Sequence, residues 1–133
     1  MIEYLSQRYQ RVVEIGIGSY PKVALALKAR GLSVVATDIQ PQAVGLPVQL
    51  DDVTAPRLDL YRDAQVIYAV RPPPELVPAL KRLAHRLAIN LVVKPLAAEP
   101  VDGVLVTRAG SFFYEFPFGE GVKRAEAGSS KRF

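Results

Sequence analysis

The sequence predicts an α/β fold in which a mostly parallel sheet carries helices on both faces and ends in an antiparallel hairpin. The run over 32–37 lacks polar alternation, which is typical of a parallel strand buried on both faces. Short apolar runs over 11–15, 64–70 and 88–93 predict further strands. Helical patterns over 20–30 and 75–86 lie between them, and this alternation favours right-handed crossovers. Two later runs, 104–108 and 111–116, flank an Ala-Gly turn and predict the closing hairpin.

The first two helices follow from local signals. Residues 2–10 carry apolar side chains at helical spacing, which predicts a short amphipathic helix. For the helix over 20–30, Ser19 is a suitable N-cap, Pro21 fits the first turn and Gly31 ends the helix. A short third strand is expected over 47–50, before the paired acids that follow it.

The second half of the chain has equally local signals. One or two helical turns are expected over 58–62. The strand over 64–70 must stop at Arg71 and the three prolines after it, because proline has no donor for a sheet. In the helix over 75–86, leucines recur at the spacing of one buried face.

Length and composition are those of one globular domain. The chain has 133 residues, of which 50% are hydrophobic and 23% charged. We expect a single domain over 1–118 and a flexible polar tail over 119–133. No apolar run is long enough for a bilayer and no signal peptide is recognisable, so we expect a cytoplasmic protein. The formal net charge of +4 fits a solvated surface, with weak attraction to nucleic acid as the alternative.

Two glycines mark a candidate ligand site after the first strand. Gly16 and Gly18 stand between a buried strand and a helix, where the chain must turn sharply. Glycine allows a positive φ and leaves the backbone open, and amides at a helix start can donate to a polar ligand. A plain strand-to-helix turn is the alternative.

Asp38 ends the second strand and is the predicted partner of that turn. A carboxylate at this position can accept hydrogen bonds from both ribose hydroxyls and would repel a 2′-phosphate. An exposed loop acid is the alternative. The dinucleotide-binding fingerprint has a third glycine at the position of Pro21. The proline at this position therefore disfavours NAD and FAD as ligands.

These residues carry a resemblance. The run from Glu14 to Gly18 resembles the acid-x-Gly-x-Gly motif of class I S-adenosylmethionine-dependent methyltransferases, and Asp38 matches their acid at the end of the second strand. The resemblance implies a Rossmann-like three-layer sandwich. More closely, the chain resembles a small, uncharacterised archaeal family with this fold. That match rests on the stretches 14–21, 51–52 and 71–76.

The resemblance implies S-adenosylmethionine as cofactor and a role for each matching residue. Glu14 would orient the methionine end, directly or through water. Gly16 and Gly18 would let the backbone pass close to the cofactor, and Asp38 would hold the ribose.

The resemblance extends to the third and fourth strand ends. Asp52 would accept from the adenine amino group while Val53 packs on the ring. Asp51 could trade places with Asp52, and a capped, solvated turn is an equal alternative. Arg71 departs from the family's Asn or Asp before two prolines. A guanidinium only donates, so Arg71 would bind a carboxylate or phosphate of the substrate, or be a surface charge.

Other chemical groups favour ordinary structural roles. His85 is the only histidine, and without recognisable partners it predicts no metal site. Aromatic residues gather near the hairpin, where packing explains them better than base stacking. They are Phe112, Phe113, Tyr114, Phe116 and Phe118.

The sequence leaves three functions open. The first is methyl transfer from S-adenosylmethionine, which needs proximity more than a catalytic side chain. Because the loops are short, an RNA, a protein or a partner subunit, such as a second copy, would have to complete the site. The second is a non-catalytic module that binds an adenosine-containing small molecule or serves in assembly. The third, an NAD-linked oxidoreductase, is disfavoured by Pro21.

Overall fold

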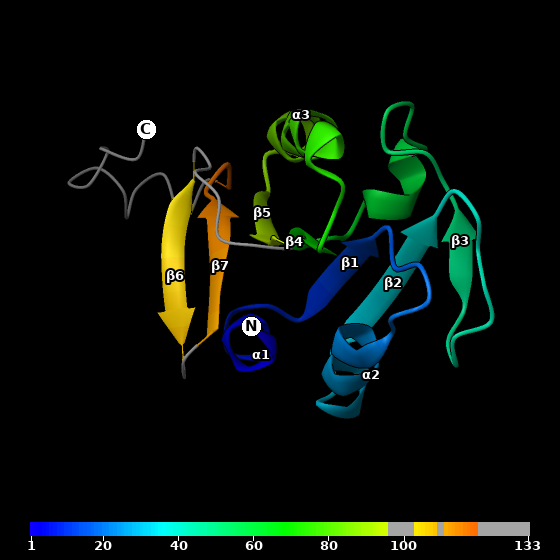
Figure 1. Cartoon of the computed structure of the whole chain (residues 1–133), viewed down its shortest axis with the longest axis horizontal. Helices are drawn as coiled ribbons and strands as arrows, with labels where there is room; N and C mark the ends of the chain where they lie inside the picture. Colours follow the sequence, from blue (N-terminus) through cyan, green and yellow to red (C-terminus); the bar gives the residue numbers. More distant parts are fainter. Residues whose placement is uncertain (96–102, 109–110, 120–133) are drawn as a thin grey trace.

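The computed structural model describes residues 1–95, 103–108 and 111–119, which form a seven-stranded sheet with helices on both faces (Figure 1). Two elements, η1 and η2, are short 3-10 helices. In chain order the elements are α1 (Ile2–Arg8), β1 (Arg11–Ile15), α2 (Lys22–Ala29), β2 (Ser33–Asp38), β3 (Val48–Leu50), η1 (Leu58–Tyr61), β4 (Val66–Val70), η2 (Pro74–Leu76), α3 (Val77–Leu87), β5 (Asn90–Lys94), β6 (Val104–Arg108) and β7 (Ser111–Phe116).

The strand order determines where the candidate site residues lie. The sheet runs β3-β2-β1-β4-β5-β7-β6, with β1 to β5 parallel and the last two strands antiparallel. The chain moves outward from β1 to β3 and then returns to β4 on the other side of β1. Helices α2 and α3 therefore cover opposite faces of the sheet (Figure 1), so the carboxyl ends of β1 and β4 form the switch point at which such folds bind ligands. The predicted fold class is confirmed.

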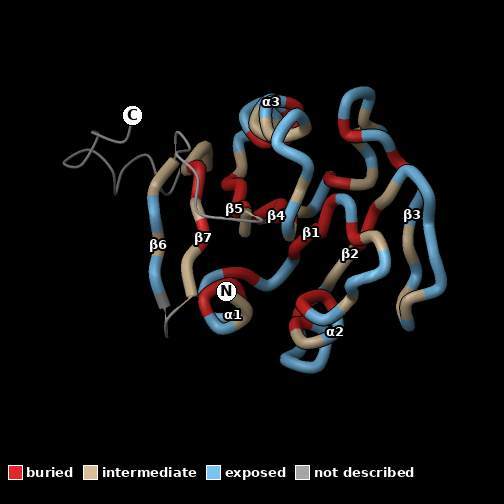
Figure 2. Tube along the Cα trace, viewed as in Figure 1, coloured by how far each residue is buried: buried red, intermediate tan, exposed pale blue. Residues whose placement is uncertain are grey.

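Apolar residues of the central strands form the core on both faces of the sheet. Under α3 and η1, Ile67 and Leu91 pack with Leu80. Under α1 and α2, Val66 packs with Leu5 and Leu27. Figure 2 shows buried segments concentrated in the central strands, as expected for strands covered on both sides.

Helix starts differ from the sequence prediction. Ser19 does not cap α2, whose N-cap is Pro21 without a side-chain hydrogen bond. Gly31 does follow the helix end, with φ +92°. The helix expected over 75–86 begins as η2 and becomes α-helical only at Val77, because proline residues at its start cannot donate to the preceding turn. The predicted Ala-Gly turn and nearly all of the predicted tail lie outside the described residues.

A buried polar network fastens α1 to the sheet far from the glycine turn. The Tyr4 and Tyr9 hydroxyls donate to the two carboxylate oxygens of Glu115, at 2.8 and 3.0 Å. The Asn90 amide donates to the Tyr9 hydroxyl at 2.9 Å. Burial, followed by the Glu115 charge, raises the pKa of Tyr9 to about 12. Since these groups satisfy one another, we assign the network to fold stability.

Candidate functional site

The glycine turn after β1 folds over the end of β2 and leaves its outer side open. The amides of Gly16 and Ile17 donate to the Thr37 carbonyl at 2.9 and 3.1 Å. Gly16 and Gly18 have φ of +74° and +57°, a region that favours glycine. A Cβ on either glycine would meet no atom within 4 Å, so the space in front of the turn is available to a ligand.

Asp38 lies directly against this turn, as the sequence predicts. Its Oδ2 atom accepts a hydrogen bond from the Gly18 amide at 2.7 Å, and Oδ1 accepts from the Gln40 amide at 2.9 Å. A carboxylate has about four acceptor positions, so two remain for hydroxyl groups of a ligand. Turn and carboxylate therefore form one polar edge at the carboxyl end of the sheet.

A pocket lined by both apolar and charged side chains continues from this edge. Its volume is about 400 Å³, and it is lined by Ile39, Leu50, Asp51, Asp52, Ala55 and Arg57. Ile39 and Leu50 are 64% and 60% exposed, although both are large and apolar. Two such side chains beside an acid suit a flat heteroaromatic ring. Neither residue was predicted from the sequence, although Ile39 directly follows Asp38 and Leu50 directly precedes Asp51.

The neighbouring acids at the end of β3 have different roles. Asp51 is buried and accepts from the Tyr61 hydroxyl and the Arg57 amide, and its Oδ1 lies 3.7 Å from the Arg57 Nε. Both oxygens are thus engaged within the fold, and the idea that Asp51 replaces Asp52 is not supported. Asp52 is exposed and accepts from the Thr54 amide and hydroxyl through Oδ1 alone; these bonds hold its pKa below the usual value.

Val53 does not lie where the resemblance implied. Its side chain is 7% exposed and belongs to the core under α3, with Ile67 and Leu80. It lines a separate cavity along α3 and not the pocket beside Leu50. In that pocket, Ile39 and Leu50 supply the apolar surface that Val53 was expected to supply.

Glu14 is a buried carboxyl group at the carboxyl end of β1. It is 1% exposed, and its Oε1 atom has no hydrogen-bond partner among the described residues. Tyr68 is its register partner in β4. Burial raises the pKa of Glu14 to about 7, against a smaller lowering effect of the Tyr68 hydroxyl. The Tyr68 hydroxyl is also buried and without a hydrogen-bond partner among the described residues, so two unsatisfied polar groups lie beside the start of the glycine turn, as at sites that meet a ligand.

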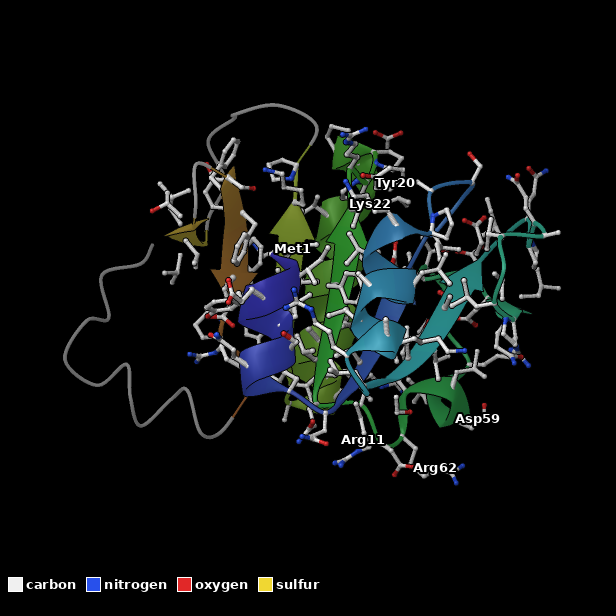
Figure 3. All side chains as sticks on the ribbon, turned by 90° about the horizontal axis from the view of Figure 1, so that it is seen from below. Met1, Arg11, Tyr20, Lys22, Asp59 and Arg62 are labelled. Carbon is white, nitrogen blue, oxygen red and sulfur yellow. The ribbon has the colours of Figure 1, made fainter. Side chains whose placement is uncertain are left out.

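Arg71 and Tyr20 meet beside the carboxyl ends of β4 and β1. The guanidinium carbon of Arg71 lies 5.4 Å from the centre of the Tyr20 ring, and Tyr20 is 41% exposed. Arg71 has φ +54° and is held by its amide, which donates to the Lys94 carbonyl at 2.6 Å. Figure 3 shows Tyr20 at the end of the molecule opposite to Arg11 and Arg62. Tyr20 was not predicted from sequence, although it directly follows the glycine turn.

Comparisons with known proteins fit this geometry. Residues 1–117 match the model of the uncharacterised protein family UPF0146. The chain belongs to this family. A UPF0146 protein of Archaeoglobus fulgidus is 36% identical over 115 residues, covering 84% of this chain and 88% of that protein. One of Halobacterium salinarum is 43% identical over 95 residues, covering 70% and 74%. These relatives are archaeal, so the resemblance inferred from the sequence is confirmed.

A solved methyltransferase shares the fold of this UPF0146 protein. It is a sugar N-methyltransferase from Streptoalloteichus, with a TM-score of 0.55, 14% identity and coverage of 79% of this chain. The chain spans about half of that enzyme, since 52% of its length is covered.

Within the described part of the chain, no helix is long and apolar enough to cross a membrane. The described residues also contain no group of three or more His, Cys, Asp or Glu side chains that could hold a metal ion.

Proposed function

We propose that this UPF0146 protein binds S-adenosylmethionine at the carboxyl ends of β1, β2 and β3 and transfers its methyl group to an acceptor. One observation carries the proposal: the Gly18 amide and the Asp38 carboxylate are joined at 2.7 Å, beside open space and a pocket lined by the exposed side chains of Ile39 and Leu50. This edge offers an open backbone, two free acceptor positions and an apolar surface in the order that a nucleoside requires.

Each part of the cofactor has a matching group in this edge. Asp38 would accept from the ribose hydroxyls, while Ile39 and Leu50 would pack on the adenine ring. Asp52 would accept from the exocyclic amino group. The unpartnered Glu14 oxygen is suited to the methionine ammonium, because a carboxylate and an ammonium form a charge-assisted hydrogen bond.

The residues of the chain contribute to the reaction mainly by position. When bound, S-adenosylmethionine supplies an electrophilic methyl group, and in-line displacement depends on orientation. Arg71 and Tyr20 border the side from which an acceptor would approach. Arg71 cannot take a proton near neutral pH, so it would bind a carboxylate or phosphate of the acceptor.

A second candidate function rests on the same arginine. Arg71 is a donor at the position where an acceptor amine would need a hydrogen-bond acceptor, and the hydrogen bond from its amide to the Lys94 carbonyl holds it there despite a φ of +54°. A module that binds an adenosine-containing ligand without catalysis would tolerate this arrangement. Such a protein would bind the cofactor and its demethylated product but transfer no methyl group.

Calorimetric titration of the purified protein tests both candidates. We expect binding of S-adenosylmethionine and S-adenosylhomocysteine, and much weaker binding of NAD. Incubation with radiolabelled S-adenosylmethionine and a cell extract then separates an enzyme from a binding module. Absence of binding to both adenosyl ligands would refute the proposal, and tight binding of NAD alone would favour the oxidoreductase.

Replacing Gly18 by Ala should weaken S-adenosylmethionine binding by at least about 10-fold, because the methyl group enters the space where the cofactor approaches the backbone. An alanine at this φ of +57° also destabilises the folded protein by about 1 kcal/mol, because its Cβ disfavours the left-handed region. Gly31→Ala is the matched control: Gly31 also has a positive φ, a Cβ there also meets no neighbouring atom, and it lies before the amino end of β2, at the opposite end of that strand from Asp38. Equal affinity losses in both variants would show that strain, and not contact, is responsible.

A further inference from the structure

We propose that the cavity along α3 is a binding site for single-stranded nucleic acid, separate from the adenosyl site. The cavity measures about 560 Å³ and is larger than the pocket beside Asp38. It lies on the α3 face of the sheet, beside the turn after β3. Its lining residues are Val53, Thr54, Pro56, Ala79, Lys81, Arg82, Leu83, His85, Arg86 and Phe118.

The cavity is strongly cationic. Two exposed arginines, Arg82 and Arg86, stand at its edge on successive turns of α3, and the exposed His85 lies between them in sequence. None of the described residues that line it is acidic. Neither arginine forms an ion pair with a described residue. Guanidinium groups bind phosphate with paired hydrogen bonds, so this arrangement fits a phosphate chain.

The floor of the cavity is apolar and carries an aromatic ring. Val53, Ala79 and Leu83 form apolar parts of the lining, and Phe118 adds a half-buried ring. The Phe118 ring meets His85 edge-on, with 5.3 Å between the ring centres. Bases stack on such rings while the backbone follows cationic groups. An acidic peptide would use the arginines but not the ring, so the combination favours nucleic acid.

Charge argues against the chain's own C-terminus as the occupant. Residues 120–133 follow directly after Gly119 in the sequence. They contain four basic and two acidic residues, so their net charge is positive, like that of the cavity, and is not complementary to it. The same basic residues would add to the attraction for phosphate groups.

This site borders the adenosyl pocket but does not depend on it. Thr54 lines the cavity, whereas Asp52, which accepts from the Thr54 amide and hydroxyl, lines the pocket. The turn after β3 is therefore a common wall. Nucleic-acid binding can be measured without any cofactor, so its failure would leave the methyl-transfer proposal standing, and the reverse also holds.

Fluorescence anisotropy of the full chain with labelled RNA and DNA strands of about 12 nucleotides tests the proposal. We expect binding that weakens with salt, and an affinity loss of at least about 10-fold in the double variant Arg82→Gln/Arg86→Gln. The double variant Arg62→Gln/Lys28→Gln removes the same charge from exposed residues elsewhere and should change affinity less than about 3-fold. Phe118→Leu keeps an apolar contact and should also weaken binding.

Three outcomes would overturn the proposal. They are absence of binding, equal losses in the two double variants, and competition by polyglutamate as effective as that by unlabelled RNA. Because a variant can lose binding by misfolding, cross-linking of the unaltered protein provides an independent test. RNA that carries 4-thiouridine should cross-link under light to peptides containing α3 or Phe118, and cross-links confined to other peptides would contradict the assignment.

Discussion

Asp38→Ala is expected to reduce the affinity for S-adenosylmethionine by at least about 100-fold. The carboxylate would provide two charge-assisted hydrogen bonds to ribose hydroxyls, each worth about 1.5–3 kcal/mol. Together these exceed the roughly 2.7 kcal/mol that corresponds to a 100-fold change. Calorimetric titration of the variant, beside the unaltered protein, measures the effect.

The Asp38 variant also loses a structural contact, so its control must separate the two effects. Asp38 accepts from the amides of Gly18 and Gln40, and its removal loosens the turn. Comparing adenosine with 2′-deoxyadenosine isolates the sugar contact: the unaltered protein should prefer adenosine, and Asp38→Ala should lose that preference. A preference that survives in the variant would mean that Asp38 does not touch the sugar. Asp59→Ala should leave the affinities for adenosine and 2′-deoxyadenosine unchanged, because Asp59 is exposed and lies at the end of the molecule opposite to Tyr20 (Figure 3).

The strands were predictable because their signal is local. Arg11–Ile15, Val104–Arg108 and Ser111–Phe116 occur with the predicted bounds, since apolar and β-branched runs end at turn residues. Helix starts were less predictable. Ser19 has the right side chain for a cap, yet the turn of Gly18 toward Asp38 leaves the start of the helix to Pro21.

The site was predictable only where sequence order alone determines spatial position. Parallel strands bring the ends of β1 and β2 together, so Gly18 and Asp38 had to converge. Nothing in the sequence distinguishes Asp51 from Asp52; the distinction depends on Tyr61, ten residues later, which buries one acid and leaves the other exposed. The cavity along α3 depends on how far the turn after β3 stands from the helix, which is a packing property.

Glu14→Gln is expected to stabilise the protein at alkaline pH. The folded pKa of Glu14 is raised from 4.5 to about 7 by burial, so the folded state keeps a proton that the unfolded chain releases. Stability therefore falls as pH rises from about 4.5 to 7, by about 3 kcal/mol in total. Glutamine has nearly the same shape without the charge. We expect the variant to be about 2–3 kcal/mol more stable than the unaltered protein at pH 8 and nearly equal to it at pH 4.5.

Urea unfolding of both proteins across this pH range measures the difference, and Glu75→Gln, an exposed acid at the start of η2, provides the control. A stability difference that does not change with pH would show that folding does not shift the pKa of Glu14. The same group links stability to function. If the ionised carboxylate binds the methionine ammonium, S-adenosylmethionine must displace the proton, so its affinity should rise with pH up to about 7 and level off above it. Glu14→Gln should abolish that rise, and the greater stability of the variant at pH 8 would then come with weaker binding.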